Sequence, residues 1–325
     1  MALPAIAATM RVMLPLLAVL ALGLTLAIGA SVWLMIWRLR HPPRRTYAWA
    51  MARSVPGDPS ELDTPREFVA TELAVGEGIR CPAWDIRGDD PQGPVIIATP
   101  GWGDSKIGAL FRIDALCAHA SRLIAWDPPG TGEARGLCPM GTREPAMVLA
   151  IARWLRAEES APAVIAHGWS LGGGVAIAAA GLDAERGTCL LDGAIAECPY
   201  RVPWTPAFRV MRGAGLPWRI NGPIAMALLG LRLTRHPRWR GFDRVRWAAR
   251  VRVPVLVIHG ARDTVCPPED GRAIAGASAS HGDFIEVPGA AHNDLWTDDR
   301  WRNAVADAVR THVRAVASRT RRPPA

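Results

Sequence analysis

The longest apolar stretch of the chain lies near its beginning. No charged residue occurs between Met13 and Trp37, and about 20 apolar residues in a helix are enough to cross the hydrocarbon core of a bilayer. A cleaved signal peptide is the alternative, but its apolar region usually has about 7–15 residues. Because the apolar run continues past Gly29 to Trp37, the pattern favours an uncleaved, single-pass transmembrane anchor over residues 1–40.

Arginines flank this predicted helix unevenly. Arg11 precedes it, and four arginines follow it: Arg38, Arg40, Arg44 and Arg45. Positively charged flanks usually stay in the cytoplasm, so we expect the rest of the chain to be cytoplasmic. Trp33 and Trp37 are expected at the membrane interface. Residues 41–65 are rich in proline, arginine and short polar residues, which predicts a linker.

From residue 66 onward, short apolar runs alternate with amphipathic segments. The predicted strands cover residues 68–75, 80–86, 95–99, 123–126, 163–166, 193–196, 255–258 and 284–287. The predicted helices include residues 107–120, 144–158 and 298–316. The first two strands are expected to pair antiparallel, whereas continuously apolar strands separated by helices predict a parallel sheet with both faces covered. The fold class is therefore α/β, with one domain over residues 66–318 and a basic tail over residues 319–325.

One turn combines a serine with glycines at a fixed spacing. Residues Gly168–Gly172 read GWSLG, and G-x-S-x-G between a strand and a helix is the pattern of a nucleophile elbow. Such a turn projects the Oγ of Ser170 outward, and a Cβ at either glycine would crowd it. The amide N–H of Leu171, at the start of the following helix, can stabilise an anionic oxygen. The same pattern also occurs in ordinary glycine-rich turns. Whether Ser170 is a nucleophile therefore depends on whether the rest of the chain supplies an acid, a base and an oxyanion hole.

A second oxyanion donor can come from the turn after the strand that ends at Thr99. This turn, Pro100–Asp104, reads PGWGD and can direct the amide N–H of Trp102 towards the same oxygen as the amide of Leu171. Two such donors in a dry site contribute several kcal/mol to catalysis, about 3 kcal/mol each. Taken alone, the turn is equally compatible with an ordinary strand-to-helix connection.

An acid and a base follow the last two predicted strands. Asp263 comes shortly after residues 255–258, where a carboxylate can accept a hydrogen bond from the Nδ1 of a histidine. His292 follows the last strand in a loop of glycine and alanine, from which it can act as general base. The chain also offers Glu197, at the end of residues 193–196, as a second candidate acid. An oxyanion turn followed by serine, aspartate and histidine is the chain order of an α/β-hydrolase.

With these motifs, residues 68–316 resemble the serine hydrolases of the α/β-hydrolase fold. The matching pieces also include the sequence DPPGTG at Asp127–Gly132. The resemblance implies a mostly parallel sheet flanked by helices, with Ser170 as nucleophile, Asp263 as acid and His292 as base. It specifies the superfamily and not a substrate.

Two positions depart from the usual pattern of this superfamily. Pro100 stands where the oxyanion turn often begins with histidine, and Ala134 stands where a serine is often found. Neither departure affects the predicted nucleophile, acid or base. Both concern the wall of the pocket, whose structure the resemblance therefore does not predict. His167 and His259 lie beside strand ends and are expected to be structural.

The insertion after residues 193–196 forms the lid in this fold. Here it covers about residues 199–252 and is short and helical. It contains many arginines against a single acid, Asp243, and its large aromatic residues include Trp204, Phe208, Trp218, Trp239 and Trp247. One hypothesis is a lid that faces an anionic membrane and admits an acyl chain. The other is a lid whose tryptophans fill its core and whose arginines are solvated.

Composition adds few constraints. The net charge is +8, but Lys106 is the single lysine, and no nucleic-acid-binding motif or aromatic-interleaved basic stripe occurs, so no nucleic-acid partner is expected. The six cysteines form neither a CxxC pair nor a metal-binding spacing with histidine. Most are expected to be buried, and Cys198 and Cys266, near strand ends, are left open as reactive thiols.

The sequence therefore predicts a membrane-anchored serine hydrolase that cleaves a carboxylic ester or thioester through an acyl-enzyme. The expected substrate is a small or lipid-like ester, and no metal or organic cofactor is required. A serine peptidase of the same fold is the first alternative, although few lid acids are present to bind a free amine. A non-enzymatic binding protein with the same fold would normally lack one of the three catalytic residues, and none is missing here.

Overall fold

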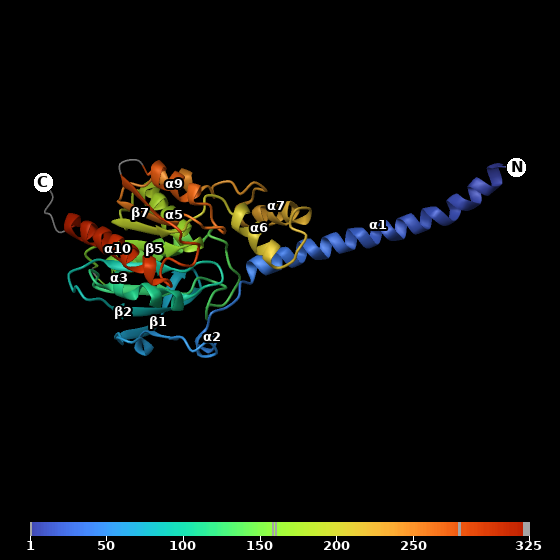
Figure 1. Ribbon diagram of the computed structural model, residues 1–325. Coiled ribbons are helices and arrows are strands. Elements are labelled where there is room, and N and C mark those ends of the chain that lie inside the picture. The colour runs from blue at the N-terminus through green and yellow to red at the C-terminus, as the bar shows by residue number, and fades with distance from the viewer. Residues whose placement is uncertain (1, 158, 160, 279–280, 321–325) are drawn as a thin grey trace.

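The computed structural model of the chain describes residues 2–157, 159, 161–278 and 281–320, with side chains described from residue 13 to residue 319. Residues 321–325 of the predicted basic tail lie outside the described residues. A long N-terminal helix projects from one side of a sheet domain, and a small helical lid lies where the two meet (Figure 1).

Eight strands form one sheet in the order β1-β2-β4-β3-β5-β6-β7-β8. Their bounds are β1 Phe68–Gly76, β2 Ile79–Arg87, β3 Val95–Thr99, β4 Arg122–Trp126, β5 Val164–Trp169, β6 Gly193–Glu197, β7 Val255–Gly260 and β8 Gly282–Val287. β2 runs antiparallel to β1 and β4, and every other pair of neighbours is parallel. The predicted antiparallel pair and the predicted, mostly parallel α/β sheet are confirmed.

Helices cover both faces of this sheet. The helices of the domain are α3 Ile113–Cys117, α4 Glu144–Ala157, α5 Leu171–Arg186, α9 Pro268–Ala277 and α10 Asp299–Thr320, with the 3-10 helix η2 Lys106–Arg112. One buried apolar cluster joins the sheet to α4, α5 and α9, and a second joins its other face to η2, α3 and α10. The continuously apolar strands are buried on both sides, as their sequences predict.

Several predicted elements differ in detail from the observed ones, and α10 continues to Thr320, into the predicted basic tail. The helix expected over residues 107–120 is split into η2 and α3. Side-chain bonds hold the start of this segment, because Asp127 accepts the backbone N–H of Lys106 at 2.7 Å and its ammonium at 2.9 Å, and such bonds compete with a regular helix. The strand expected over residues 163–166 continues to Trp169, because β3 pairs with it as far as Gly168 and β6 as far as Trp169.

The segment predicted to be a linker packs on the domain. It contains α2, Tyr47–Met51, and the 3-10 helix η1, Pro59–Glu61. Trp49, Val55 and Leu62 lie against the apolar cluster beneath η2, α3 and α10. This segment therefore connects the N-terminal helix to the sheet along the protein surface rather than through open solvent.

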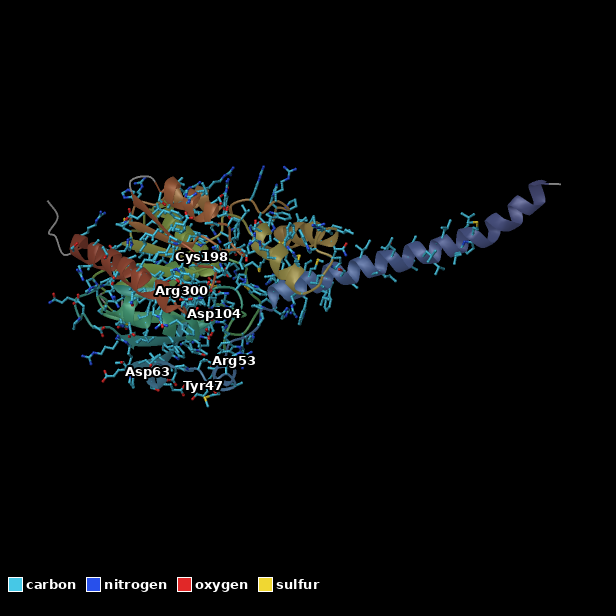
Figure 2. All side chains as sticks on the ribbon, viewed as in Figure 1. Tyr47, Arg53, Asp63, Asp104, Cys198 and Arg300 are labelled. Atoms are coloured by element: carbon cyan, nitrogen blue, oxygen red, sulfur yellow. The ribbon has the colours of Figure 1, made fainter. Side chains whose placement is uncertain are left out.

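The first helix, α1 Ala2–Arg40, extends far beyond the domain (Figure 1). Its portion Met13–Arg40 is long and apolar enough to cross a membrane, and the side chains drawn along its projecting part are chiefly carbon (Figure 2). Val32, Met35 and Leu39, near its end, are buried. They pack against the lid, which consists of α6 Trp204–Gly213, α7 Asn221–Thr234 and α8 Arg244–Ala248.

Candidate active site

The turn between β5 and α5 has the strained geometry of a nucleophile elbow. Ser170 lies at φ 54° and ψ −116°, a conformation that side-chain-bearing residues rarely adopt. A Cβ on Gly168 would come within 2.3 Å of the backbone of Gly172, and a Cβ on Gly172 within 2.0 Å of the Thr99 carbonyl oxygen. The prediction that both glycines are sterically required is confirmed. The backbone N–H of Ser170 donates to the carbonyl of Glu197 at 2.7 Å, which fixes the turn to β6.

The structure brings the predicted serine, histidine and aspartate into one chain of hydrogen bonds. The Nε2 of His292 lies 3.1 Å from the Oγ of Ser170, and its Nδ1 lies 2.6 Å from the Oδ2 of Asp263. The three residues come from the ends of β5, β7 and β8, which lie on the same edge of the sheet because these strands are parallel. A neutral imidazole held in this way can accept a proton from the serine at Nε2.

Four donors surround the carboxylate of Asp263. Its Oδ1 accepts the backbone N–H groups of Val265 and Cys266 at 2.7 and 2.8 Å, and the Nε2 of His259 lies 3.2 Å from its Oδ2. Burial alone would raise the pKa of Asp263, but the hydrogen bonds from His259, His292 and the Cys266 amide hold it well below its usual value. The group is therefore an anion at neutral pH.

Glu197, the second candidate acid, lies in a different network. Its Oε1 is 2.9 Å from the Nε2 of His167, and its Oε2 accepts a hydrogen bond from the Nε of Arg112 at 2.8 Å. Burial opposes ionisation, but the charge of Arg112 and the bond to His167 lower the pKa of Glu197 to about 2. The structure does not bring this carboxylate to His292.

The two predicted oxyanion donors flank the nucleophile. A Cβ on Gly101 would lie 3.2 Å from the Cβ of Ser170, so the turn that carries Trp102 lies directly against the serine. Leu171 is the first residue of α5, where amide N–H groups have no partner within the helix. Among the described residues, the amide N–H of Trp102 has no hydrogen-bond acceptor either. These two groups are suited to hold an anionic oxygen beside Ser170.

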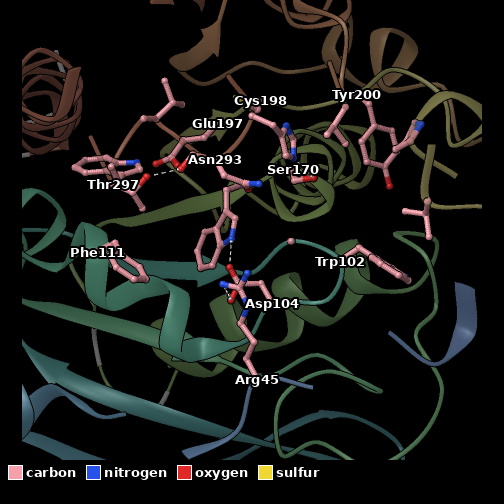
Figure 3. Close-up of a pocket in the computed structure, with 18 of the residues that line it drawn as sticks. Arg45, Trp102, Asp104, Phe111, Ser170, Glu197, Cys198, Tyr200, Asn293 and Thr297 are labelled. Carbon is pink, nitrogen blue, oxygen red and sulfur yellow. Dashed lines mark hydrogen bonds and ion pairs between the residues drawn. The ribbon is translucent and has the colours of Figure 1, made fainter. Parts of the chain in front are cut away.

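A cavity of about 440 Å³ opens beside Ser170 (Figure 3). Its lining is largely apolar and includes Leu39, Trp49, Met140, Val210 and Val265. This volume lies within the usual range for small-molecule sites, about 300–1,000 Å³. Leu39 belongs to α1 and Val210 to α6, so the first helix and the lid both contribute to the wall.

The charged groups of this cavity are paired with one another, and of these only Glu197 was predicted as a candidate acid. Arg45 lies 3.1 Å from the Oδ1 of Asp104, whose Oδ2 accepts the indole N–H of Trp169 at 2.9 Å, as Figure 3 shows. Arg112 pairs with Glu197. Asp104 stands in the quoted oxyanion turn, which was a usable signal, whereas nothing in the local sequence around Arg112 points to this site.

Cysteines near the site are buried thiols. All six cysteines are free, and only Cys189 is exposed. Burial and the nearby Asp263 raise the pKa values of Cys198 and Cys266 well above the usual range, which keeps both thiols protonated. The sulfur of Cys198 and the ligand atoms of Asp263 and His292 lie within 4.8 Å of one another. A metal ion held there would compete with the hydrogen bond between Asp263 and His292.

The aromatic residues of the lid pack against one another. Trp239 is buried, and Trp204, Phe208 and Trp218 are partly buried around the same cluster. The exposed apolar surface of the lid comes instead from aliphatic residues of α7 and the residue before it: Ile220, Ile224, Leu228 and Leu231. Trp204, Trp218 and Trp239 therefore fit the second of the two hypotheses, in which the lid tryptophans fill the core, whereas Trp247 is not part of this cluster.

Comparison with known proteins places the fold. No family model matches the chain. An uncharacterised protein of Mycobacterium tuberculosis is 28% identical over 285 residues, which cover 86% of this chain and 88% of that protein. Among solved structures, the esterase Pf2001 of Pyrococcus furiosus is similar, with a TM-score of 0.63, 18% identity and coverage of 85% of this chain and 99% of that chain.

Two further solved structures are similar at lower TM-scores. The α/β-hydrolase GrgF of a Penicillium species has a TM-score of 0.56 and 18% identity, and it covers 77% of this chain and 100% of its own. The esterase RhEst1 of a Rhodococcus species has a TM-score of 0.52 and 22% identity, and it covers 76% of this chain and 99% of its own. Together with the strand order and the serine turn between β5 and α5, these similarities show that the chain is a protein of the α/β-hydrolase fold.

Proposed function

We propose that this protein is a serine hydrolase that cleaves a carboxylic ester or thioester through an acyl-enzyme. The observation that carries the proposal is the continuous line of hydrogen bonds from Asp263 through His292 to Ser170. The esterases among its structural neighbours have the same fold. Their similarity does not identify the substrate of this chain.

In the proposed reaction, His292 takes the proton of Ser170 at Nε2 while Oγ attacks the carbonyl carbon of the ester. The tetrahedral intermediate carries an oxyanion, which the amides of Trp102 and Leu171 stabilise. The C–O bond to the alcohol breaks, and His292 returns its proton to this leaving group. Water then attacks the acyl-enzyme with His292 as base, and the carboxylic acid leaves. Asp263 stabilises the imidazolium at both stages.

The lining of the cavity supports an apolar acyl chain over a peptide. A peptidase that recognises a free amino terminus needs an unpaired carboxylate near the serine. The two acids of this cavity, Asp104 and Glu197, are already paired with Arg45 and Arg112. Aliphatic and aromatic side chains form most of the remaining wall.

Labelling with a fluorophosphonate probe tests the proposal directly. We expect the full-length protein in detergent to be labelled, Ser170→Ala to be unlabelled, and Ser318→Ala, on the exposed side of α10, to be labelled like the wild type. A panel of p-nitrophenyl esters of increasing chain length then defines the acyl preference. Equal labelling of the wild type and Ser170→Ala would contradict the proposal.

We also propose that α1 anchors the protein as a single-pass helix with the catalytic domain in the cytoplasm. Its length and apolar composition support the span, and the arginines after it support the orientation. Protease treatment of intact cells should leave the domain uncut, and treatment of opened cells should digest it. Digestion in intact cells would contradict the orientation.

We further propose that α7 lies in the membrane beside α1. Between Asn221 and Leu231 it carries no charged residue, and one face packs on α1. The opposite face leaves Ile220, Ile224, Leu228 and Leu231 between 46% and 72% exposed. A helix that is apolar on all sides is usually buried or in contact with lipid. α6 and α7 project from the domain along α1, towards its N-terminal end (Figure 1).

Depth-dependent quenching by spin-labelled lipids tests this position of α7. The exposed Cys189 is first replaced by serine, and a fluorophore is then attached at Leu228→Cys in protein reconstituted into nanodiscs. We expect strong quenching there and none at Arg250→Cys, an exposed position after α8. Equal quenching at the two sites, or none at Leu228→Cys, would place α7 outside the lipid.

A further inference from the structure

The end of α1 and the segment directly after it contact the oxyanion turn at three points. The indole N–H of Trp102 donates to the carbonyl oxygen of Leu39 at 2.9 Å. Arg45 pairs with Asp104 at 3.1 Å. Between these contacts, Pro43 lies next to Gly103, and a Cβ on Gly103 would be 3.5 Å from the Cδ of Pro43. The chain segment that leaves the anchor therefore follows the turn over most of its length.

These contacts also complete the anchor helix. The last four carbonyl groups of a helix have no partner within it. The catalytic domain supplies two donors for this end of α1, because Trp102 binds the carbonyl of Leu39 and the backbone N–H of Cys138 binds the carbonyl of Arg40 at 3.0 Å. The hydrogen bond from Trp102 thus satisfies a group of the anchor and at the same time restrains a residue of the active site.

The position of this helix end is well defined by packing. Met35 and Leu39 are no more than 1% exposed, and they pack into the same apolar cluster as Met226 and Leu229 of α7. Leu39 also lines the cavity beside Ser170. The anchor is therefore held by the lid on one side and by the oxyanion turn on the other.

We infer that the end of α1 is a positioning element of the active site. The carbonyl of Leu39 holds the indole of Trp102, and this bond sets the direction of the Trp102 amide towards the oxyanion. The inference rests on the proposed hydrolase function and adds a coupling to it: the enzyme is fully active only when its membrane helix is docked. A misplacement of about 1 Å in a catalytic group can reduce a rate by about 100-fold, so a small shift of this turn is sufficient.

The first test is Trp102→Phe in the full-length protein in detergent. This change removes the indole donor but keeps an aromatic side chain and the backbone amide. We expect kcat to fall about tenfold while KM changes less than twofold, because an oxyanion donor acts chiefly in the transition state. The affinity for a trifluoromethyl ketone, whose adduct carries an oxyanion, should fall by the same factor. A purely structural role of the side chain would lower the melting temperature without this parallel loss.

A matched pair of variants tests whether docking of α1 is the cause. Met35 is buried against the lid, whereas its neighbour Leu34 is 40% exposed on another side of the same helix. Met35→Gln should lower kcat and the trifluoromethyl ketone affinity about as much as Trp102→Phe. Leu34→Gln adds the same polar group to the same turn and should leave both values within twofold of the wild type.

Hydrogen exchange gives a readout that does not depend on catalysis. Met35→Gln should speed amide exchange in residues 101–105, and Leu34→Gln should not. If the wild type is not labelled by a fluorophosphonate, the proposed hydrolase function fails, and the exchange difference still reports whether the anchor positions the turn. Unchanged exchange in Met35→Gln, or unchanged kcat in both Trp102→Phe and Met35→Gln, would overturn the inference.

Discussion

Two buried carboxylates lie at the ends of adjacent parallel strands, and each bonds to a histidine. Glu197 ends β6 and bonds to His167 at 2.9 Å. Asp263 follows β7 and bonds to His292 at 2.6 Å. Both carboxyl groups have a lowered pKa despite burial, so burial and charge alone do not distinguish them.

Their histidines differ in where the second ring nitrogen points. His167 is fully buried within β5, and its Nδ1 has no partner among the described residues. His292 stands in the loop after β8, and its second nitrogen faces Ser170. The other oxygen of Glu197 bonds to Arg112, whereas the other oxygen of Asp263 accepts two backbone amides. One carboxylate therefore joins strands and helices together, and the other is suited to support a base.

The largest expected difference between these carboxylates is in activity. Asp263→Asn should lower kcat/KM about 10⁴-fold, because an amide at this position favours the wrong tautomer of His292. Glu197→Gln should lower it less than about tenfold, because Glu197 does not contact His292. Ester hydrolysis by the two variants, with Ser170→Ala as background, measures both effects. A loss in Glu197→Gln that equals the loss in Asp263→Asn would make Glu197 the functional acid.

For the free energy of unfolding, the larger effect is expected at Glu197. Glu197→Gln leaves the Arg112 side chain, which is 11% exposed, without its carboxylate. Breaking one partner of a buried ion pair typically costs about 3–5 kcal/mol, so we expect a loss of this size in the free energy of unfolding. The double variant Glu197→Leu/Arg112→Met should recover much of it, because an apolar pair leaves no buried charge. Urea unfolding in detergent measures the three proteins. A Glu197→Gln protein as stable as the wild type would show that the pair is not structural.

The sequence predicts one side of this comparison better than the other. Strand ends, glycine turns and chain order identified Ser170, Asp263 and His292 as candidates, and the structure brings all three together. The partner of Glu197 is Arg112, which lies 85 positions earlier in the sequence, and no local pattern links two such residues. The docking of α1 on the lid and on Trp102 could not be predicted from the sequence for the same reason. An apolar helix predicts a membrane span, but contacts of its last turns depend on tertiary packing.

The next effect is the pH dependence of the stability that Glu197, the structural carboxylate, contributes. The pKa of Glu197 is about 2 in the folded protein, below the value of about 4.3 in an unfolded chain. A lowered pKa stabilises the fold at pH values above about 4.3, and this contribution is lost as the pH falls from there towards 2. The difference corresponds to about 3 kcal/mol. The stability advantage of the wild type over Glu197→Gln should therefore be constant near neutral pH and shrink below pH 4. An advantage that is independent of pH would rule out the ionised carboxylate as its source.

The smallest effect is expected at the two buried histidines that sequence analysis treats as structural. The Nε2 of His259 lies 3.2 Å from Asp263 and 3.0 Å from the carbonyl of Cys266, so it can share one proton between them. His259→Phe removes this donor and keeps a planar ring. Hydrogen bonds to charged groups are worth about 1.5–3 kcal/mol. We therefore expect kcat/KM of His259→Phe to fall about tenfold, which corresponds to a loss of about 1.4 kcal/mol in the transition state. His167→Phe removes the matching donor from Glu197 and should change kcat/KM less than twofold while lowering the melting temperature. Equal kinetic losses in the two variants would mean that both histidines act only through stability, and that the two networks do not differ in function.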